Sequence, residues 1–143
     1  MKREELEIGD WVYHDDIVFG REIAKIDRLN KAKNRETIGV TVYSSDGAFC
    51  VVGYILTSPT NNDIHPIPLT PEILENNGFT QVGCSDSPLW EYDNFAMVKI
   101  CDEWKIRVVT FLATTYTVRY VHELQQFMRK ICDNKYIDNQ IFL

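Results

Sequence analysis

The sequence predicts an α+β fold, in which an N-terminal, SH3-like β unit of about four strands precedes a short helix, an antiparallel β-meander and a C-terminal helix. Three observations predict it. The first 56 residues contain short runs rich in β-branched and aromatic residues. Residues 70–78 carry start and stop signals of one helix, and residues 120–132 repeat apolar residues at helical spacing. We expect two units, 1–63 and 64–143, either separate or built around one shared core.

The strands of the first unit are expected in four places. Gly9-Asp10 is a turn that leads into the strand Trp11–Tyr13. The segment after Gly20 fits a strand or a helix, and its shortness favours a strand. The Asp-Gly pair at 46–47 predicts a hairpin that joins strands at 37–43 and 48–56. Four short strands in about fifty residues favour a small, strongly bent sheet or barrel.

The second unit begins with a stiff connector and a short helix. Prolines 66 and 68 keep residues 64–69 extended. Thr70 is a helix cap, Pro71 suits the first helical position, and Gly78 suits the left-handed conformation that ends a helix. Strands are then expected at 79–82, 89–92, 95–100, 104–111 and 116–119. A second helix is expected over Tyr120–Cys132.

Composition restricts the classes of protein to which the chain can belong. It has 143 residues, 45% hydrophobic and 25% charged, which is a globular mixture large enough to fold without a metal or a disulfide. The four cysteines include no C-x-x-C pair, so we expect small buried thiols and no cofactor. The longest apolar run, Val51–Leu56, is far shorter than the ~20 residues of a membrane span. Met1–Glu5 lacks a signal-peptide pattern, so we expect a cytoplasmic protein without a membrane partner.

Four segments, in order, resemble a family of small uncharacterised proteins of phages and mobile elements in gut-type bacteria. The family pattern is IG[ND]WV, PIPLT, GF and YVH[QE]LQ, and the matching segments are Leu6–Val12, Ile64–Leu74, Asn77–Phe79 and Arg119–Gln126. Glu7, Pro71, Glu123 and Gln126 depart from the residues usual in that pattern. The resemblance implies an intracellular protein of mobile-element origin, and it assigns no catalytic residue.

A basic segment is the most distinctive candidate surface. Between positions 25 and 35, five basic residues accompany the single acid Asp27, so this segment carries +4 within a chain of net charge −6. The basic residues are Lys25, Arg28, Lys31, Lys33 and Arg35. Together with Trp11, Tyr13 and Tyr43 as stacking surfaces, they could form an arm that contacts phosphates. The alternative is a solvated hairpin tip whose lysines discourage pairing between strand edges.

His122 is the single residue that suggests catalysis. It lies near the start of the second predicted helix, where the helix dipole lowers the pKa of an imidazole and favours the neutral form. Packing against Tyr120 or capping explains it equally well. No G-x-S-x-G, phosphate-binding glycine loop or H-E-x-x-H motif occurs. His14-Asp15-Asp16 is better explained as a solvated turn than as a metal site, so we expect no metal.

These patterns favour a non-enzymatic accessory binding protein of a phage or mobile element, with a host or phage protein as partner. One alternative is a nucleic-acid-binding module that uses the basic segment. Another is a small hydrolase or nuclease that pairs His122 with Asp102 or Glu103. The apolar C-terminal residues Ile141–Leu143 predict either packing within the chain or a homodimer.

Overall fold

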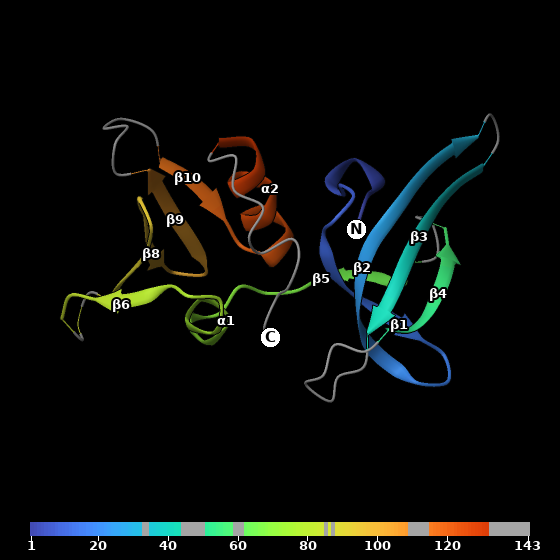
Figure 1. Ribbon diagram of the computed structural model, residues 1–143, viewed down its shortest axis with the longest axis horizontal. Helices are drawn as coiled ribbons and strands as arrows, with labels where there is room; N and C mark the ends of the chain where they lie inside the picture. Colours follow the sequence, from blue (N-terminus) through green and yellow to red (C-terminus); the bar gives the residue numbers. More distant parts are fainter. Residues whose placement is uncertain are drawn as a thin grey trace.

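The computed structural model describes residues 1–32, 35–43, 51–58, 62–84, 86, 88–108 and 115–131. These residues form two antiparallel five-stranded sheets and two short helices. The sheets lie at opposite ends of the long axis, with the second helix, α2 (Val121–Ile131), between them (Figure 1). The first sheet is built from the N-terminal half of the chain, and the second sheet from residues 80–118.

The N-terminal sheet has the strand order β4-β3-β2-β1-β5. Its strands are β1 (Trp11–Asp16), β2 (Gly20–Ala32), β3 (Arg35–Tyr43), β4 (Val51–Thr57) and β5 (Ile64–Pro66). Alternate residues of β1, β2 and β3 point to one face, as strand geometry requires. That face, with Leu6 and Ile64, forms a first core cluster: Leu6, Val12, Ala24, Ile26, Ile38, Val40, Val42 and Ile64.

This sheet corrects the predicted fold class. The strands β4 and β5 lie at opposite edges and do not pair, so the sheet is open and the SH3-like barrel was wrong. The fold is mostly β and not α+β, because the two helices contain only six and eleven residues. The basic segment, expected as an arm or a solvated hairpin tip, is strand in its described part, since β2 continues to Ala32 by pairing with β3.

The C-terminal sheet is a meander with its strands in chain order, β10-β9-β8-β7-β6. Its strands are β6 (Thr80–Val82), β7 (Leu89–Tyr92), β8 (Phe95–Ile100), β9 (Glu103–Val108) and β10 (Thr115–Val118). The predicted strands of this half are therefore confirmed within a few residues of their ends. The pairing that sequence could not predict places Met97 opposite Trp90 on one side and opposite Ile106 on the other.

Both predicted helices are present. In α1 (Pro71–Asn76) the Thr70 hydroxyl oxygen accepts a hydrogen bond from the Ile73 amide at 3.2 Å, which satisfies a donor left open at the helix start. After the helix, Gly78 adopts a left-handed φ of +89°, and the Phe79 amide donates to the Leu74 carbonyl at 3.0 Å. The apolar repeat predicted within residues 120–132 forms a buried stripe on α2 that includes Val121, Leu124 and Met128.

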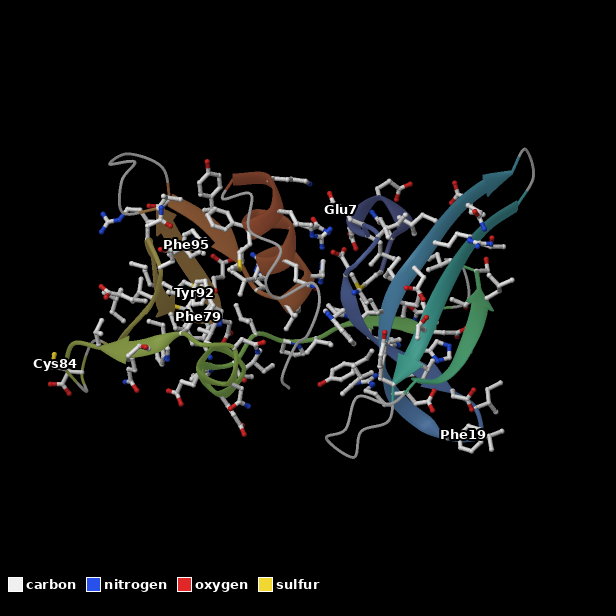
Figure 2. All side chains as sticks on the ribbon, viewed as in Figure 1. Glu7, Phe19, Phe79, Cys84, Tyr92 and Phe95 are labelled. Carbon is white, nitrogen blue, oxygen red and sulfur yellow. The ribbon has the colours of Figure 1, made fainter. Side chains whose placement is uncertain are left out.

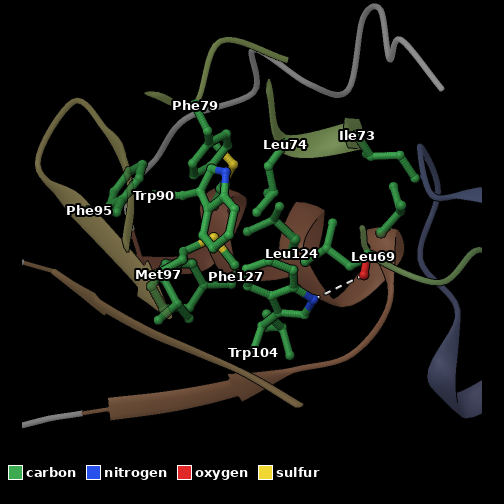
Figure 3. Packing of buried hydrophobic residues seen from close by; sticks show 14 of the residues in the cluster. Leu69, Ile73, Leu74, Phe79, Trp90, Phe95, Met97, Trp104, Leu124 and Phe127 are labelled. Atoms are coloured by element: carbon green, nitrogen blue, oxygen red, sulfur yellow. Dashed lines mark hydrogen bonds between the residues drawn. The ribbon is translucent and has the colours of Figure 1, made fainter. Parts of the chain in front are cut away.

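The larger core cluster joins the second sheet, both helices and one residue of the first sheet. Trp90 and Trp104 meet edge to face with their ring centroids 5.2 Å apart, under Leu74 of α1 and Leu124 of α2 (Figure 3). The Trp104 indole donates a hydrogen bond of 2.9 Å to the Leu69 carbonyl, which ties β9 to the connector (Figure 3). Trp11 of β1 belongs to this cluster, so the two sheets share part of one core.

A polar network, here called the docking network, attaches α2 to the start of β1. Gln125 accepts a hydrogen bond from the Trp11 amide at 2.8 Å and donates one to the Gly9 carbonyl at 3.0 Å. Arg129 pairs with Asp10, whose side chain is fully buried, and with Glu7 at 3.1 Å. A buried carboxylate requires such a partner because its desolvation is costly. The network therefore fixes the N-terminal sheet against the helix.

Two further expectations concern cysteines and membranes. Cys84 and Cys101 are exposed free thiols, contrary to the expectation of buried cysteines, whereas Cys50 and Cys132 lie outside the described residues. The helices that the structure describes are all too short or too polar to cross a membrane. The strand β5 joins the first sheet, so the chain leaves that sheet after Pro66.

Candidate functional site

The turn between β1 and β2, here called the tip, exposes three consecutive apolar side chains. Ile17, Val18 and Phe19 have exposed fractions of 103%, 80% and 78%. Phe19 points away from the body of the protein at the end of the hairpin (Figure 2). Single exposed apolar residues are ordinary on protein surfaces, but a contiguous apolar group at a projecting turn is characteristic of a contact site.

Local hydrogen bonds hold the tip in one conformation. One carboxylate oxygen of Asp16 accepts hydrogen bonds from the Val18 amide at 2.7 Å and from the Phe19 amide at 2.9 Å. These two bonds lower the pKa of Asp16, with the bond from Phe19 having the larger effect. Gly20, at φ +78°, returns the chain into β2 opposite Asp16. The apolar side chains are therefore presented by an ordered turn.

A polar collar surrounds the base of the tip and is mostly acidic. Arg21 binds Asp15 through two hydrogen bonds of 2.7 and 2.9 Å, and these lower the pKa of Asp15. His65 of β5 also approaches Asp15, with its Nε2 atom 3.0 Å from the Asp15 Oδ2 atom. Glu22, the residue after Arg21 in β2, adds a third carboxylate 3.8 Å from His14, with a side chain that is 18% exposed. The collar thus has three acids and one arginine, with His65 at its edge.

The basic residues predicted as a binding surface lie along β2 and β3. Lys25 sits over the Trp11 ring, with its ammonium nitrogen 5.6 Å from the ring centroid. Arg28 is exposed just after a bulge in β2, where Asp27 accepts a hydrogen bond from the Thr41 hydroxyl. The backbones of Lys31 and Arg35 are paired in strands, but their side chains, and all of Lys33, lie outside the described residues.

Of the three aromatic residues predicted to stack on bases, Trp11 is buried and Tyr43 is half-buried, and Tyr13 is half-buried with the Arg21 guanidinium over its ring. Trp11 is 2% exposed and contacts Tyr43 at a ring-centroid distance of 4.9 Å. Tyr43 is half-buried against the larger core cluster, and this burial, followed by the nearby Asp27 carboxylate, raises the pKa of its hydroxyl. Trp11 therefore offers no exposed ring to a nucleic-acid base.

His122 is the second residue of α2 and is buried. Its ring stacks on Tyr120 with centroids 5.7 Å apart and an interplanar angle of 10°. Burial lowers the pKa of His122, whereas the carboxylates of Asp10, Glu123 and Glu5 oppose that shift. Within the described residues no hydrogen bond or ion pair joins His122 to Asp102 or Glu103.

The partners that the hydrolase hypothesis needs are engaged elsewhere. Glu103 pairs with Lys105 at 3.0 Å and with Arg119, and these cations lower its pKa. In the part of the chain that the structure describes, no group of three or more His, Cys, Asp or Glu side chains could hold a metal ion. The C-terminal residues expected to form a homodimer contact lie outside the described residues.

Known proteins give no further guidance. The chain matches no protein-family model, no curated protein and no solved structure. The resemblance to phage and mobile-element proteins therefore stays a prediction. Function has to be inferred from the geometry of the tip, the basic strands and the surroundings of His122.

The tip is the feature that sequence reasoning missed. Ile17-Val18-Phe19 stands between two aspartates and a glycine, at a place where the chain must reverse. A run of three apolar residues inside a turn cannot be buried by the two strands that it joins. That conflict between turn position and apolar composition was the signal in the sequence.

Proposed function

We propose that this protein is a binding protein that recognises a partner protein through its apolar tip, Ile17, Val18 and Phe19. The supporting observation is that these three consecutive side chains are almost fully exposed on a turn that hydrogen bonds hold in place. Exposure of this kind opposes solubility and contributes nothing to the cores of the described residues. Binding a partner protein would explain why the exposed apolar tip is present.

Simple energetics support the proposal. Burying one large apolar side chain is worth about 1.5–3 kcal/mol, so the tip can supply roughly 4–9 kcal/mol before the costs of association. Because Asp16 already fixes the amides of Val18 and Phe19, little turn entropy is lost on binding. The tip alone is therefore sufficient for a weak to moderate complex, which contacts around the collar would strengthen.

The acidic collar specifies the chemistry of the partner. An apolar cleft rimmed by lysine or arginine complements the tip and the carboxylates of Asp15, Asp16 and Glu22. The same carboxylates would be repelled by anionic lipid and by nucleic-acid phosphates. A protein partner is therefore favoured over a membrane or a nucleic acid at this surface. Nucleic-acid binding through Lys25 and Arg28, and a role in a phage or mobile element, stay predictions.

Site-specific crosslinking tests the proposal. We would place a photoreactive phenylalanine analogue at Phe19, crosslink in cell lysate and identify the products by mass spectrometry. We expect a discrete partner, whose purified form binds the unaltered protein and loses at least tenfold in affinity to the variant Ile17→Ser, Val18→Ser, Phe19→Ser. The partner's contact surface, mapped from the crosslink, should be an apolar cleft with basic residues around it.

A matched control separates the tip from general stickiness. Leu56 and Ile100 are also exposed large apolar residues, but each stands away from the tip in a strand of its own sheet. The variant Leu56→Ser, Ile100→Ser should retain full affinity. Equal losses in both variants, an acidic contact surface on the partner, or co-sedimentation of the unaltered protein with phosphatidylcholine vesicles through the tip would each overturn the proposal.

A further inference from the structure

Among the described residues, the strand β4 is the least protected edge of the two sheets. The outer strands of a sheet carry N–H and C=O groups without a partner, and proteins usually protect such edges with short strands, charges or proline. Three of the four edge strands follow this rule. The strands β6 and β10 have only three and four residues. The strand β5 has three, including Pro66, and the Met1 ammonium, just before the turn η1 (Arg3–Glu5), donates to the Ile64 carbonyl at 3.2 Å.

The strand β4 is longer than the other edge strands and carries neither a charge nor a proline. It pairs with β3 on one side (Figure 1), and its seven residues are Val51–Thr57. The pairing with β3 is regular from Gly53 to Thr57. Within the described residues, no backbone hydrogen bond outside the pairing with β3 involves this strand. Its outer edge therefore offers hydrogen-bonding groups to another strand.

Two apolar side chains of β4 are incompletely covered by the chain itself. Ile55 lies opposite the fully buried Val40 and is half-buried at the margin of the first core cluster. Leu56 is 60% exposed, and its partner in β3 is Gly39, which has no side chain to pack against it. A strand on the outer side of β4 would supply cross-strand neighbours for both residues, and such neighbours stabilise a sheet.

We propose that the β4 edge pairs with the β4 edge of a second copy of this chain, antiparallel about a two-fold axis near Ile55. The two Ile55 side chains then lie opposite each other, and the two N-terminal sheets become one continuous sheet. Antiparallel pairing of one strand with its copy is self-complementary, since both copies present the same row of donors and acceptors. Because β4 has no charged residue, this pairing places no like charges opposite each other.

A second copy is favoured over an extended segment of another protein because the contact then covers both chains equally. Ile55 and Leu56 lack full cover in each copy, and the two-fold axis brings the same two residues of both copies to one interface. The residues of this interface are not those of the tip. The inference therefore goes beyond the proposed protein-binding function and does not depend on it.

The dimer should be weak and should become stronger as salt is added. The regular part of the edge spans only residues 53–57, so the interface is much smaller than those of permanent dimers. Each copy carries a net charge of −6, so two copies repel each other at low ionic strength. Raising the salt concentration from about 0.05 to about 0.5 M screens this repulsion and should increase the association constant.

Sedimentation velocity and NMR test the proposal on the full chain. Between about 0.02 and about 1 mM protein we expect a reversible change from monomer to dimer, and a larger dimer fraction at high salt. In ¹H–¹⁵N spectra of the same dilution series, the concentration-dependent shifts should gather at residues 53–57 and not at residues 141–143. A reducing agent, present throughout, prevents disulfide formation through the exposed Cys84 and Cys101.

A matched pair of lysine variants tests the edge itself. Leu56→Lys adds a charge to the edge strand, which is a protection that β4 lacks, and should weaken the dimer at least tenfold. Ile100→Lys is the control, because Ile100 is 52% exposed and the change in charge is the same, but β8 is an inner strand between β7 and β9. Its dimer should be unchanged. The variant in which all three tip residues are serine should also dimerise like the unaltered protein.

Three outcomes would overturn the proposal. A chain that is still monomeric at about 1 mM would exclude the second copy and make an extended segment of another protein the candidate occupant. Concentration-dependent shifts confined to residues outside β4 would place the dimer contact elsewhere. Equal effects of Leu56→Lys and Ile100→Lys would show that net charge, and not the edge, controls association. The crosslinking experiment at Phe19 is independent of these results, so the proposed function is tested separately.

Discussion

The two sheets differ in what their side chains do. Among the described residues a cluster of seventeen buried side chains, including Trp90, Trp104 and Phe95, lies mostly in the C-terminal half and counts Trp11 of the first sheet among its members. The N-terminal sheet has its own cluster of eight, all aliphatic, and is fastened to the larger one by Trp11 and the docking network. It is also the sheet that carries the exposed tip and the basic strands. Most of the buried apolar side chains in the described residues therefore belong to the C-terminal half, whereas the N-terminal half carries the surface proposed for recognition.

The largest expected effect is the loss of a central aromatic residue from the C-terminal half. Trp104→Ala should lower the free energy of unfolding by about 3–5 kcal/mol, because a buried ring is lost and the Leu69 carbonyl loses its donor. Urea denaturation, monitored by circular dichroism, measures this change in the free energy of unfolding. Val40→Ala, in the aliphatic cluster, should cost less. A larger loss from Val40→Ala would show that the N-terminal sheet dominates stability.

The attachment between the halves comes next. Arg129→Met should cost about 3 kcal/mol, because it leaves the fully buried Asp10 carboxylate without its cation. Lys130→Met is the matched control on the same helix: this lysine pairs with Glu7, but its side chain is 59% exposed. Its loss should stay below about 1 kcal/mol. If the two variants unfold at the same urea concentration, the docking network contributes no more than a surface ion pair.

A smaller effect is expected at the end of α1. Gly78 has φ +89°, and a methyl group there would lie 3.4 Å from the Tyr92 ring. Gly78→Ala should therefore cost about 1–2 kcal/mol. Gly53 in β4 lacks both a positive φ and any atom within 4 Å of an added methyl group, so Gly53→Ala should be close to neutral. Thermal unfolding of the two variants side by side decides whether the conformation, and not merely the added methyl group, is responsible.

The smallest effect is a dependence of stability on pH at the junction of the two halves. Because burial lowers the pKa of folded His122 below its ordinary value of 6.5, the unfolded chain binds a proton more readily. Stability should therefore fall as pH drops below about 6.5, until the folded ring also takes up a proton. His122→Phe should remove this part of the slope between pH 7.5 and 5. An unchanged slope in this variant would show that other titratable groups cause the pH dependence of stability.

Local signals were predictable and long-range pairings were not. The caps Thr70 and Gly78 specify α1 through contacts within a few residues, and the apolar stripe specifies α2, so both helices could be predicted. The partnership of Asp10 with Arg129 joins residues 119 positions apart, and no local pattern encodes it. Trp11 was expected as a surface for stacking. Its burial depends on packing against α2, which is more than a hundred residues away in the sequence, so no local pattern predicts it. The barrel was wrong because strand periodicity gives neither closure nor the order of strands.

The strand β2 extends beyond the ends of the strands beside it. Beyond the bulge at residues 26–28, β2 no longer pairs with β1, and in β3 the residues before Ile38 have no partner in β4 (Figure 1). Residues 30–32 and 35–37 are thus a two-stranded ribbon, which is marginally stable by itself. None of its residues belongs to either core cluster. The backbones of Lys31 and Arg35 lie in this ribbon, so these two basic residues stand on the part of the sheet that neither core cluster supports.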